Sequence, residues 1–160
     1  MASAWFMTFT GTLIAASLLA GARSSAFGEE VLSAEGETPD MRIEVRDLKR
    51  SGDGTVTLRL TLVNDSTERF DHDCGMRDPD FSDACEAFSG GYLLDGANKK
   101  KYLVVRDSEK NCICSNVANV EPGKKMNIWA TYPAPPAEVA KVTVVVPLFE
   151  PIEGVPITGP

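Results

Sequence analysis

Residues 56–62 read Val56-Thr-Leu-Arg-Leu-Thr-Leu62, and this stretch decides the fold class. Its four aliphatic residues alternate with Thr, Arg and Thr. Successive side chains of a β-strand point to opposite faces of a sheet, so this period of two predicts a strand with one buried and one solvated face. We expect this strand at the centre of a sheet, because its alternation is the most regular in the chain.

Similar short patterns lie on both sides of this stretch. Residues 41–48 (MRIEVRDL) alternate in the same way, and the Gly-rich segment 51–55 predicts a hairpin between the two runs. Further strands are predicted at 92–94, 102–106, 125–132 and 141–147, the last continuing less regularly to residue 157. Turn residues separate these runs, and none has a helical period. About seven short strands without a helix predict an all-β, two-sheet antiparallel sandwich.

The N-terminal residues have the pattern of an export signal. An apolar run from about residue 9 to residue 20 precedes two candidate cleavage positions, Ala22 and Ala26. This run is shorter than the roughly 20 apolar residues of a membrane-spanning helix. We expect a signal peptide over 1–26, a flexible acidic linker over 27–40 and one domain over 41–160, with no stable membrane insertion after cleavage and a final location outside the cell or at its surface.

The overall charge and the cysteine content restrict the function further. The formal net charge is −7, which argues against nucleic acid or an anionic membrane surface as a partner. All four cysteines lie in the part expected to be exported: Cys74, Cys85, Cys112 and Cys114. An even number of cysteines in an oxidising compartment favours two disulfides. Three connectivities are open at this point.

An acidic segment suggests one alternative function, the binding of Ca²⁺. Carboxylates are dense between residues 71 and 86, and extracellular calcium sites use such oxygen ligands. The spacing of an EF-hand is absent, and a solvated acidic loop stapled by a disulfide is the competing interpretation. The candidate metal ligands are Asp71, Asp73, Asp78, Asp80 and Asp83.

Sulfur and imidazole groups suggest two more alternatives. His72, Cys74 and Met76 would share one face of a strand and could bind copper, but the chain has only one His and a blue-copper site needs two. A structural cysteine beside an exposed His72 is the competing interpretation. Cys112 and Cys114 could carry out thiol–disulfide exchange, although no helix N-terminus is expected there to stabilise a thiolate. A structural bridge is the simpler interpretation of that pair.

No pattern in the chain points to catalysis. A Ser-His-Asp triad would have to use His72, and no Gly-x-Ser-x-Gly elbow presents a nucleophile. Trp129, Tyr132 and Tyr92 could form a sugar-binding platform, but aromatic residues on sandwich strands usually pack against neighbouring residues. We therefore expect no enzyme activity, no catalytic residues and no cofactor.

The order of the strand and turn motifs resembles that of a known family. The motifs are TVTLRLTLVNDS (55–66), YLLDGANKKKYLVVRDSEKNCICS (92–115), VEPGKKMNIWATYPAPP (120–136) and VTVVVPLFEPIEGVPI (142–157). They resemble the immunoglobulin-like extracellular domain of secreted bacterial proteins, as found in actinobacterial lipoproteins and before outer-membrane-protein-A-like domains. Ala22 stands where a bacterial lipobox has Cys, so lipid attachment is not implied.

This resemblance implies an immunoglobulin-like antiparallel β-sandwich of about seven strands and brings no catalytic residues. Because it centres on the close cysteine pair, it favours local pairing, Cys74 with Cys85 and Cys112 with Cys114. We expect an exported, non-enzymatic interaction or structural module that binds a protein or a cell-wall component, through loops at one end of the sandwich. A metal-binding protein and a thiol–disulfide exchange protein remain the alternatives.

Overall fold

The computed structural model describes Met1 and residues 31–159. Apart from Met1, the expected signal peptide lies outside the described residues, as do residues 27–30 of the expected linker. The described part of the chain contains no helix long and apolar enough to cross a membrane. It is built from strands, which are β1 (Ser33–Glu35), β2 (Met41–Arg50), β3 (Thr55–Asn64), β4 (Tyr92–Asp95), β5 (Lys100–Leu103), β6 (Lys125–Pro133), β7 (Lys141–Val145) and β8 (Ile152–Pro156).

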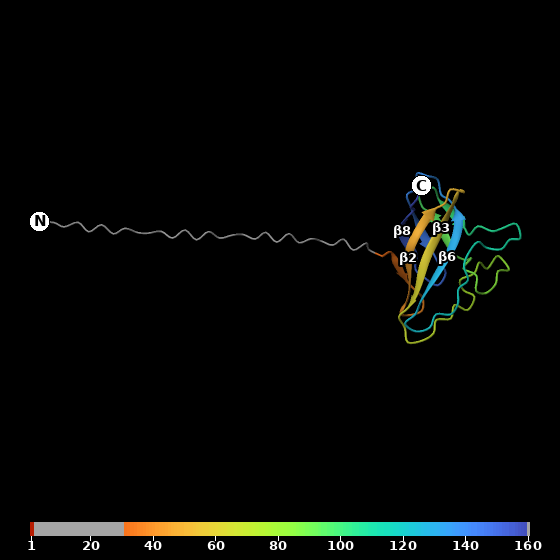
Figure 1. Ribbon diagram of the computed structural model, residues 1–160, viewed down its shortest axis with the longest axis horizontal. Coiled ribbons are helices and arrows are strands. Elements are labelled where there is room, and N and C mark those ends of the chain that lie inside the picture. Colours follow the sequence, from red (N-terminus) through yellow and green to blue (C-terminus); the bar gives the residue numbers. More distant parts are fainter. Residues whose placement is uncertain (2–30, 160) are drawn as a thin grey trace.

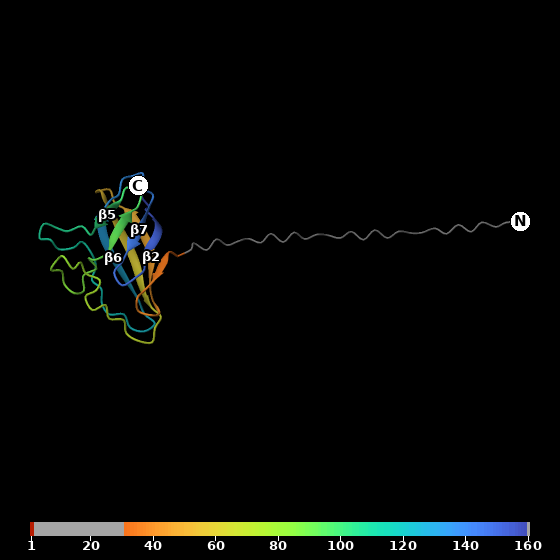
Figure 2. The same ribbon diagram turned by 180° about the vertical axis from the view of Figure 1, so that it is seen from behind.

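The strands form two four-stranded sheets that lie face to face (Figures 1 and 2). One sheet has the order β1-β2-β3-β6 and the other the order β5-β4-β7-β8. All neighbouring strands are antiparallel. The predicted all-β, two-sheet antiparallel architecture is therefore confirmed. The described residues form eight strands, where the sequence predicted about seven.

The additional strand, β1, lies inside the segment expected to be a linker. It pairs with β2 in the register Ala34 to Ile43, and Ala34 is buried. Gly36 then allows a close approach, because a Cβ there would lie 3.1 Å from the Phe149 ring. The ordered domain thus begins before Met41. A strand of three residues is too short to produce a recognisable period of two, which is why the sequence pattern did not predict it.

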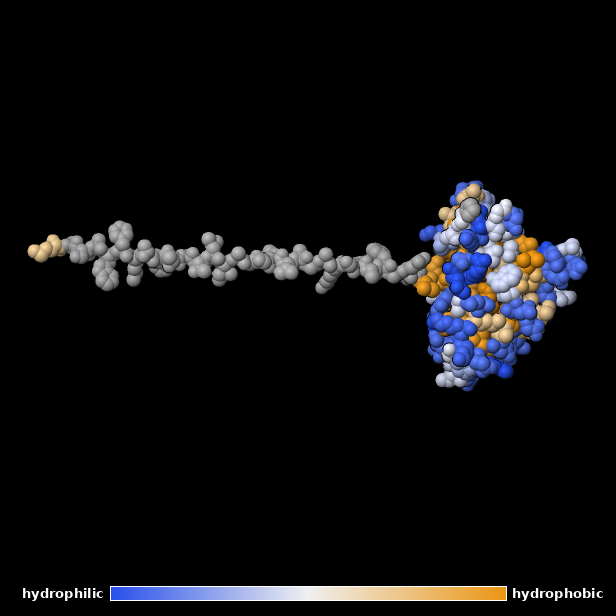
Figure 3. Space-filling view, in the orientation of Figure 1, coloured by the Kyte–Doolittle hydropathy of each residue, from blue (hydrophilic) through white to orange (hydrophobic). Residues whose placement is uncertain are grey.

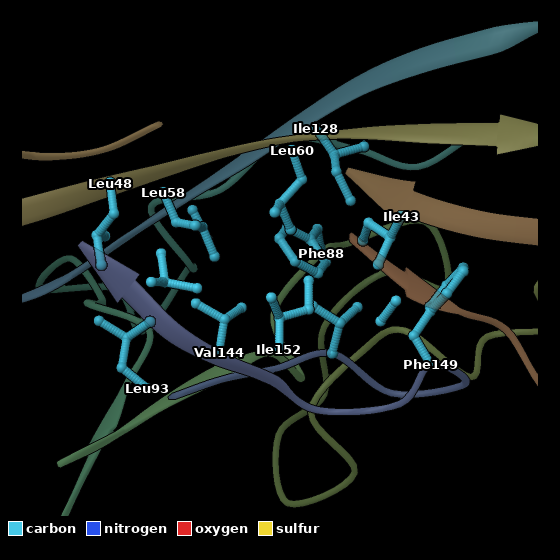
Figure 4. Packing of buried hydrophobic residues seen from close by; sticks show 14 of the residues in the cluster. Ile43, Leu48, Leu58, Leu60, Phe88, Leu93, Ile128, Val144, Phe149 and Ile152 are labelled. Atoms are coloured by element: carbon cyan, nitrogen blue, oxygen red, sulfur yellow. The ribbon is translucent and has the colours of Figure 1, made fainter. Parts of the chain in front are cut away.

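The core lies between the two sheets, and its β3 side chains are the aliphatic residues that alternate in residues 56–62. Val56, Leu58, Leu60 and Leu62 of β3 are fully buried, as predicted. Figure 4 shows Leu58 and Leu60 pointing toward side chains of the opposite sheet, with Phe88 between the layers. Each buried aliphatic side chain of this kind contributes about 1.5–3 kcal/mol relative to exposure. The hydrophobic effect on this inner face therefore holds the two sheets together.

Two long irregular segments connect the sheets, and they project from the same side of the sandwich (Figures 1 and 2). The first loop is residues 65–91, between β3 and β4, and the second loop is residues 104–124, between β5 and β6. Each loop sends side chains into the core, namely Met76 and Phe88 from the first and Val117 from the second. Isolated bridges join Phe70 to Val120 and Ala87 to Asn116. The loops are thus packed against the sandwich and against each other.

Candidate functional site

The second loop extends one sheet by running antiparallel beside β6. The N–H of Thr131 donates to the carbonyl of Ile113 at 3.0 Å, and the N–H of Ser115 donates to the carbonyl of Trp129 at 2.8 Å. The N–H of Ile113 donates in turn to the carbonyl of Val105 at 2.8 Å. Backbone hydrogen bonds therefore hold the segment 113–115 on both sides.

All four cysteines form disulfides within their own loops. Cys74 is joined to Cys85 in the first loop, with a Cα–Cα distance of 4.4 Å. Cys112 is joined to Cys114 in the second loop, with a Cα–Cα distance of 5.4 Å. This is the local pairing that the family resemblance favoured. The four side chains are half-buried, and no free cysteine is found in the part of the chain that the structure describes.

A cleft of about 640 Å³ opens between the two loops. Its walls are residues 80–84 and Ala87 of the first loop, and residues 109–112 with Cys114 and Asn116 of the second. Both cysteines of the second loop therefore face a space that solvent can enter. Cys74 and Cys85 do not line this cleft.

An ion pair between Arg106 and Asp83 connects the two loops. The two guanidinium nitrogens Nη1 and Nη2 donate to Oδ1 and Oδ2 of Asp83, each at 2.8 Å. The Ser89 hydroxyl donates to Asp83 Oδ2 at 2.5 Å, and Arg106 also donates to the Lys110 carbonyl at 2.8 Å. The guanidinium carbon lies 3.5 Å from the centre of the Phe81 ring. Two parallel hydrogen bonds fix the geometry as well as the charge.

Both members of this ion pair are almost excluded from water, with side-chain exposures of 13% for Arg106 and 8% for Asp83. The hydrogen bonds from Arg106 hold the pKa of Asp83 below its usual range, against the opposing effect of burial. The same hydrogen bonds raise the pKa of Arg106. Asp83 is therefore a carboxylate at neutral pH, and each of its two oxygens accepts at least one hydrogen bond from the protein.

Three of the five carboxylates predicted to bind a metal lie near an Arg side chain. Asp83 is paired with Arg106, and Asp78 Oδ2 lies 3.7 Å from the same guanidinium. Asp71 lies 3.7 Å from an Arg69 nitrogen, while the side chains of Asp73 and Asp80 are exposed. The described residues contain no group of three or more His, Cys, Asp or Glu that could hold a metal ion. Ca²⁺ binding by the acidic segment stays a hypothesis.

His72 is buried, with 6% exposure, where the sequence interpretation expected it to be exposed. Its Nε2 lies 3.1 Å from the Val117 carbonyl, and its buried Nδ1 has no hydrogen-bond partner among the described residues. The chain turns at Asp73 and Cys74, where φ is 42° and 59°, so His72, Cys74 and Met76 do not lie along a strand. Cys74 is also held in a disulfide, and a thiolate ligand is therefore missing from the copper set.

The three aromatic residues considered as a sugar platform lie apart. Tyr132 is fully buried, and Tyr92 belongs to β4 in the other sheet. Trp129 is 40% exposed on the outer face of β6, where Arg59 of β3 is its register partner. The Ser115 hydroxyl accepts a hydrogen bond from the Trp129 N–H at 3.0 Å. Trp129 and the half-buried Tyr92 thus point outward from different sheets, and the three rings cannot form one platform.

A second exposed apolar side chain, Ile113, accompanies Trp129. It is 36% exposed and lies opposite Thr131 on the segment that extends the sheet. We define the Trp129 face as the outward side chains of Arg59, Ile113, Trp129 and Thr131. The side of the molecule over β2, β3 and β6 carries hydrophobic residues among hydrophilic ones (Figure 3). The Trp129 face is therefore a mixed apolar and polar surface on a rigid sheet.

The ion pair and the extension of the sheet were not predicted from the sequence. Arg106 and Asp83 are 23 residues apart, and no spacing rule connects positions in two irregular loops. Comparisons with protein-family models, with curated proteins and with solved structures find no match to this chain. The geometry of the described residues is thus the basis for a functional proposal.

Proposed function

We propose that this chain is an exported, non-enzymatic immunoglobulin-like module that binds a protein partner outside the cell or at its surface. The observation that carries the proposal is the Trp129 face, where a large aromatic ring is 40% exposed on a strand held on both sides by hydrogen bonds. Trp and Arg are enriched among the residues that dominate binding energy at protein interfaces. A rigid anchor of this kind loses little conformational entropy on binding.

The strand order supports the immunoglobulin-like part of the proposal. In immunoglobulin-type sandwiches the first, second and fifth strands share one sheet, and the third, sixth and seventh share the other. Counting from β2, the strands β2, β3 and β6 share a sheet, and β8, β7 and β4 share the other with β5 at its edge. β5 then corresponds to the extra strand of the variable type, and β1 is an addition at the outer edge.

The disulfides support export. Structural disulfides form and persist in oxidising compartments and are rare in the cytosol. The bridge between Cys74 and Cys85 closes an irregular part of the first loop that has no strand of its own. The expected signal peptide over 1–26 agrees with the same location.

The size and composition of the outer face favour a protein over a polysaccharide. The strands of this sheet have 3, 10, 10 and 9 residues, which at a rise of about 3.3 Å and a spacing of about 4.8 Å give an area of roughly 500 Å². A stable protein interface buries about 800 Å² per partner, and the projecting loops add to the available area. Ile113 contributes a branched aliphatic surface, which suits packing against another protein core better than the polar face of a sugar.

This function can be tested by mixing the purified exported chain with cell envelopes of its source and measuring how much of it is retained. We expect retention that is lost when the envelopes are treated with protease, and reduced at least tenfold by Trp129→Ala. Leu103→Ala is the matched control, because Leu103 is 49% exposed on the opposite sheet. Retention on protease-treated envelopes or on isolated cell-wall polysaccharide would assign a cell-wall ligand instead. Equal retention of Trp129→Ala and the parent chain would remove the Trp129 face as the binding surface.

A further inference from the structure

The bridge between Cys112 and Cys114 spans one residue and adds little to the fold. The intervening residue, Ile113, is already fixed by backbone hydrogen bonds to Val105 on one side and Thr131 on the other. Ser115 is fixed to Trp129 in the same way. A disulfide stabilises a protein mainly by restricting the unfolded chain, and a very short loop offers little freedom to restrict. The segment therefore keeps its place without the bridge.

The other disulfide has the opposite properties. Cys74 and Cys85 are separated by 11 positions in a segment without strands, and the chain adopts a positive φ at Cys74. Closing this loop removes more freedom from the unfolded chain, by about 1 kcal/mol on the loop-length scale. The molecule thus contains one bridge with a clear structural role and one without it.

The bridge without a clear structural role is also the one that faces the cleft. Cys112 and Cys114 both line the space between the two loops, and both are half-buried rather than enclosed. The charged side chains along the same walls are those of Asp80, Asp83, Glu109 and Lys110, with Asp83 already paired to Arg106. A neutral or cationic thiol can therefore approach more easily than an anionic one.

We propose that Cys112 and Cys114 form a redox-active couple that exchanges electrons with the dithiols of other proteins. A thiolate of the partner attacks one of the two sulfurs, which forms a mixed disulfide and releases the other cysteine as a thiolate. The second thiol of the partner then attacks the mixed disulfide and releases the first cysteine. The partner becomes a disulfide, and two electrons and two protons have passed to Cys112 and Cys114.

The backbone geometry prepares the couple for the reverse step. The two Cα atoms lie 5.4 Å apart in the bonded pair, and backbone hydrogen bonds at Ile113 and Ser115 fix the segment beside them. This distance is within the range that a disulfide accepts. Closure is then intramolecular between two positioned thiols, which gives a high effective concentration. The bridge flanks Ile113, which belongs to the Trp129 face, but the two proposals are tested by different measurements, since a binding module without redox activity and a redox protein without that partner are both consistent with the fold.

Stepwise reduction of the folded chain with dithiothreitol, a neutral dithiol, tests the proposal. Thiol alkylation and peptide mass spectrometry then report each bridge separately, and Cys74–Cys85 serves as the internal control. We expect Cys112–Cys114 to open at a roughly tenfold lower reductant concentration, and to close again first when an excess of oxidised dithiothreitol is added to accept the two electrons. Reduction of both bridges together, or of Cys74–Cys85 first, would overturn the proposal.

Two double variants separate redox chemistry from structure. Cys112→Ser with Cys114→Ser should leave the thermal midpoint close to that of the parent chain, while Cys74→Ser with Cys85→Ser should lower it clearly. The single variant Cys114→Ser leaves Cys112 as a thiol that can attack the disulfide of an oxidised peptide and stay joined to it as a mixed disulfide, and Cys112→Ser tests the other sulfur. Failure of both single variants to form a mixed disulfide, with folding preserved, would also contradict the exchange step.

Discussion

Arg106 and Asp83 meet through two hydrogen bonds of 2.8 Å, each in a loop that carries its own disulfide. The Arg106 side chain stacks on Phe81 and also binds the Lys110 carbonyl, so it contacts both loops. Its partners Asp83, Phe81 and Lys110 line the same cleft as Cys112 and Cys114. The position of the first loop relative to the second therefore depends on this ion pair.

Replacement of Arg106 by Met should destabilise the protein by about 2–4 kcal/mol, because it leaves the Asp83 carboxylate buried without its partner. Urea unfolding of the variant and the parent chain measures this difference. Arg59→Met is the matched control. Arg59 pairs with Asp47 at 2.8 Å, but both side chains are well exposed, and such pairs contribute less than about 1 kcal/mol. An equal loss in both variants would contradict the role given to Arg106.

The same ion pair should make the protein sensitive to acid. The folded-state pKa of Asp83 lies below its unfolded value, mainly because of the hydrogen bonds from Arg106. The stabilisation is therefore complete above the unfolded pKa of about 3.9, and it is lost as the pH falls through the lower folded pKa. Thermal unfolding between neutral and strongly acidic pH measures the effect.

The variant Asp83→Asn isolates this contribution from those of other carboxyls. Local turn hydrogen bonds also lower the pKa of Asp53, Asp95 and Asp107, so part of the acid sensitivity remains in the variant. We expect the stability gap between parent and variant to be constant above about pH 5 and to narrow in acid. A gap that does not change with pH would show that Asp83 acts by packing and not by charge.

Leu60→Ala should destabilise the protein by about 2–5 kcal/mol, since Leu60 is fully buried between the sheets. Thr57→Ala, on the opposite face of the same strand, should change stability by less than about 1 kcal/mol. Chemical denaturation of both variants compares the two faces of β3 directly. Similar losses at the two positions would contradict the assignment of the inner face.

Ca²⁺ should leave the thermal midpoint unchanged. Asp83 is paired with Arg106, and the described residues contain no group of three or more His, Cys, Asp or Glu that could hold a metal ion. A ligand that binds only the folded state must raise the midpoint, so melts with about 10 mM Ca²⁺ and with EDTA give a direct answer. A midpoint that rises with Ca²⁺ but not with Mg²⁺ would restore the calcium hypothesis. The same comparison with Cu⁺ tests the set of His72, Cys74 and Met76.

The sequence predicts this structure best where side chains alternate. The pattern of residues 56–62 predicts both the strand β3 and its buried face, because the period of two is a local property of the backbone. The strand β1 has only three residues and depends on the position of Ile43 across the sheet, so no local period marks it. It extends the domain into the segment expected to be a linker.

The site is less predictable than the fold, because its residues meet through irregular loops. The sequence interpretation expected His72 to be exposed. The loop turns at Asp73 and Cys74, and the buried imidazole contacts the Val117 carbonyl. The ion pair of Arg106 requires Asp83, which lies 23 positions earlier in the other loop. Contacts of this kind follow from the tertiary arrangement and leave no periodic signal in the chain.

The attachment of residues 113–115 to β6 has a further consequence for solubility. The outward N–H groups of Trp129 and Thr131 donate to Ser115 and Ile113, and their carbonyls accept from Ser115 and Val105. An unpaired sheet edge is a template for pairing with another chain and leads to aggregation. Here the protein covers part of that edge with its own second loop. A shortened second loop would therefore expose the backbone groups of β6, and edge-to-edge association with another chain would be favoured.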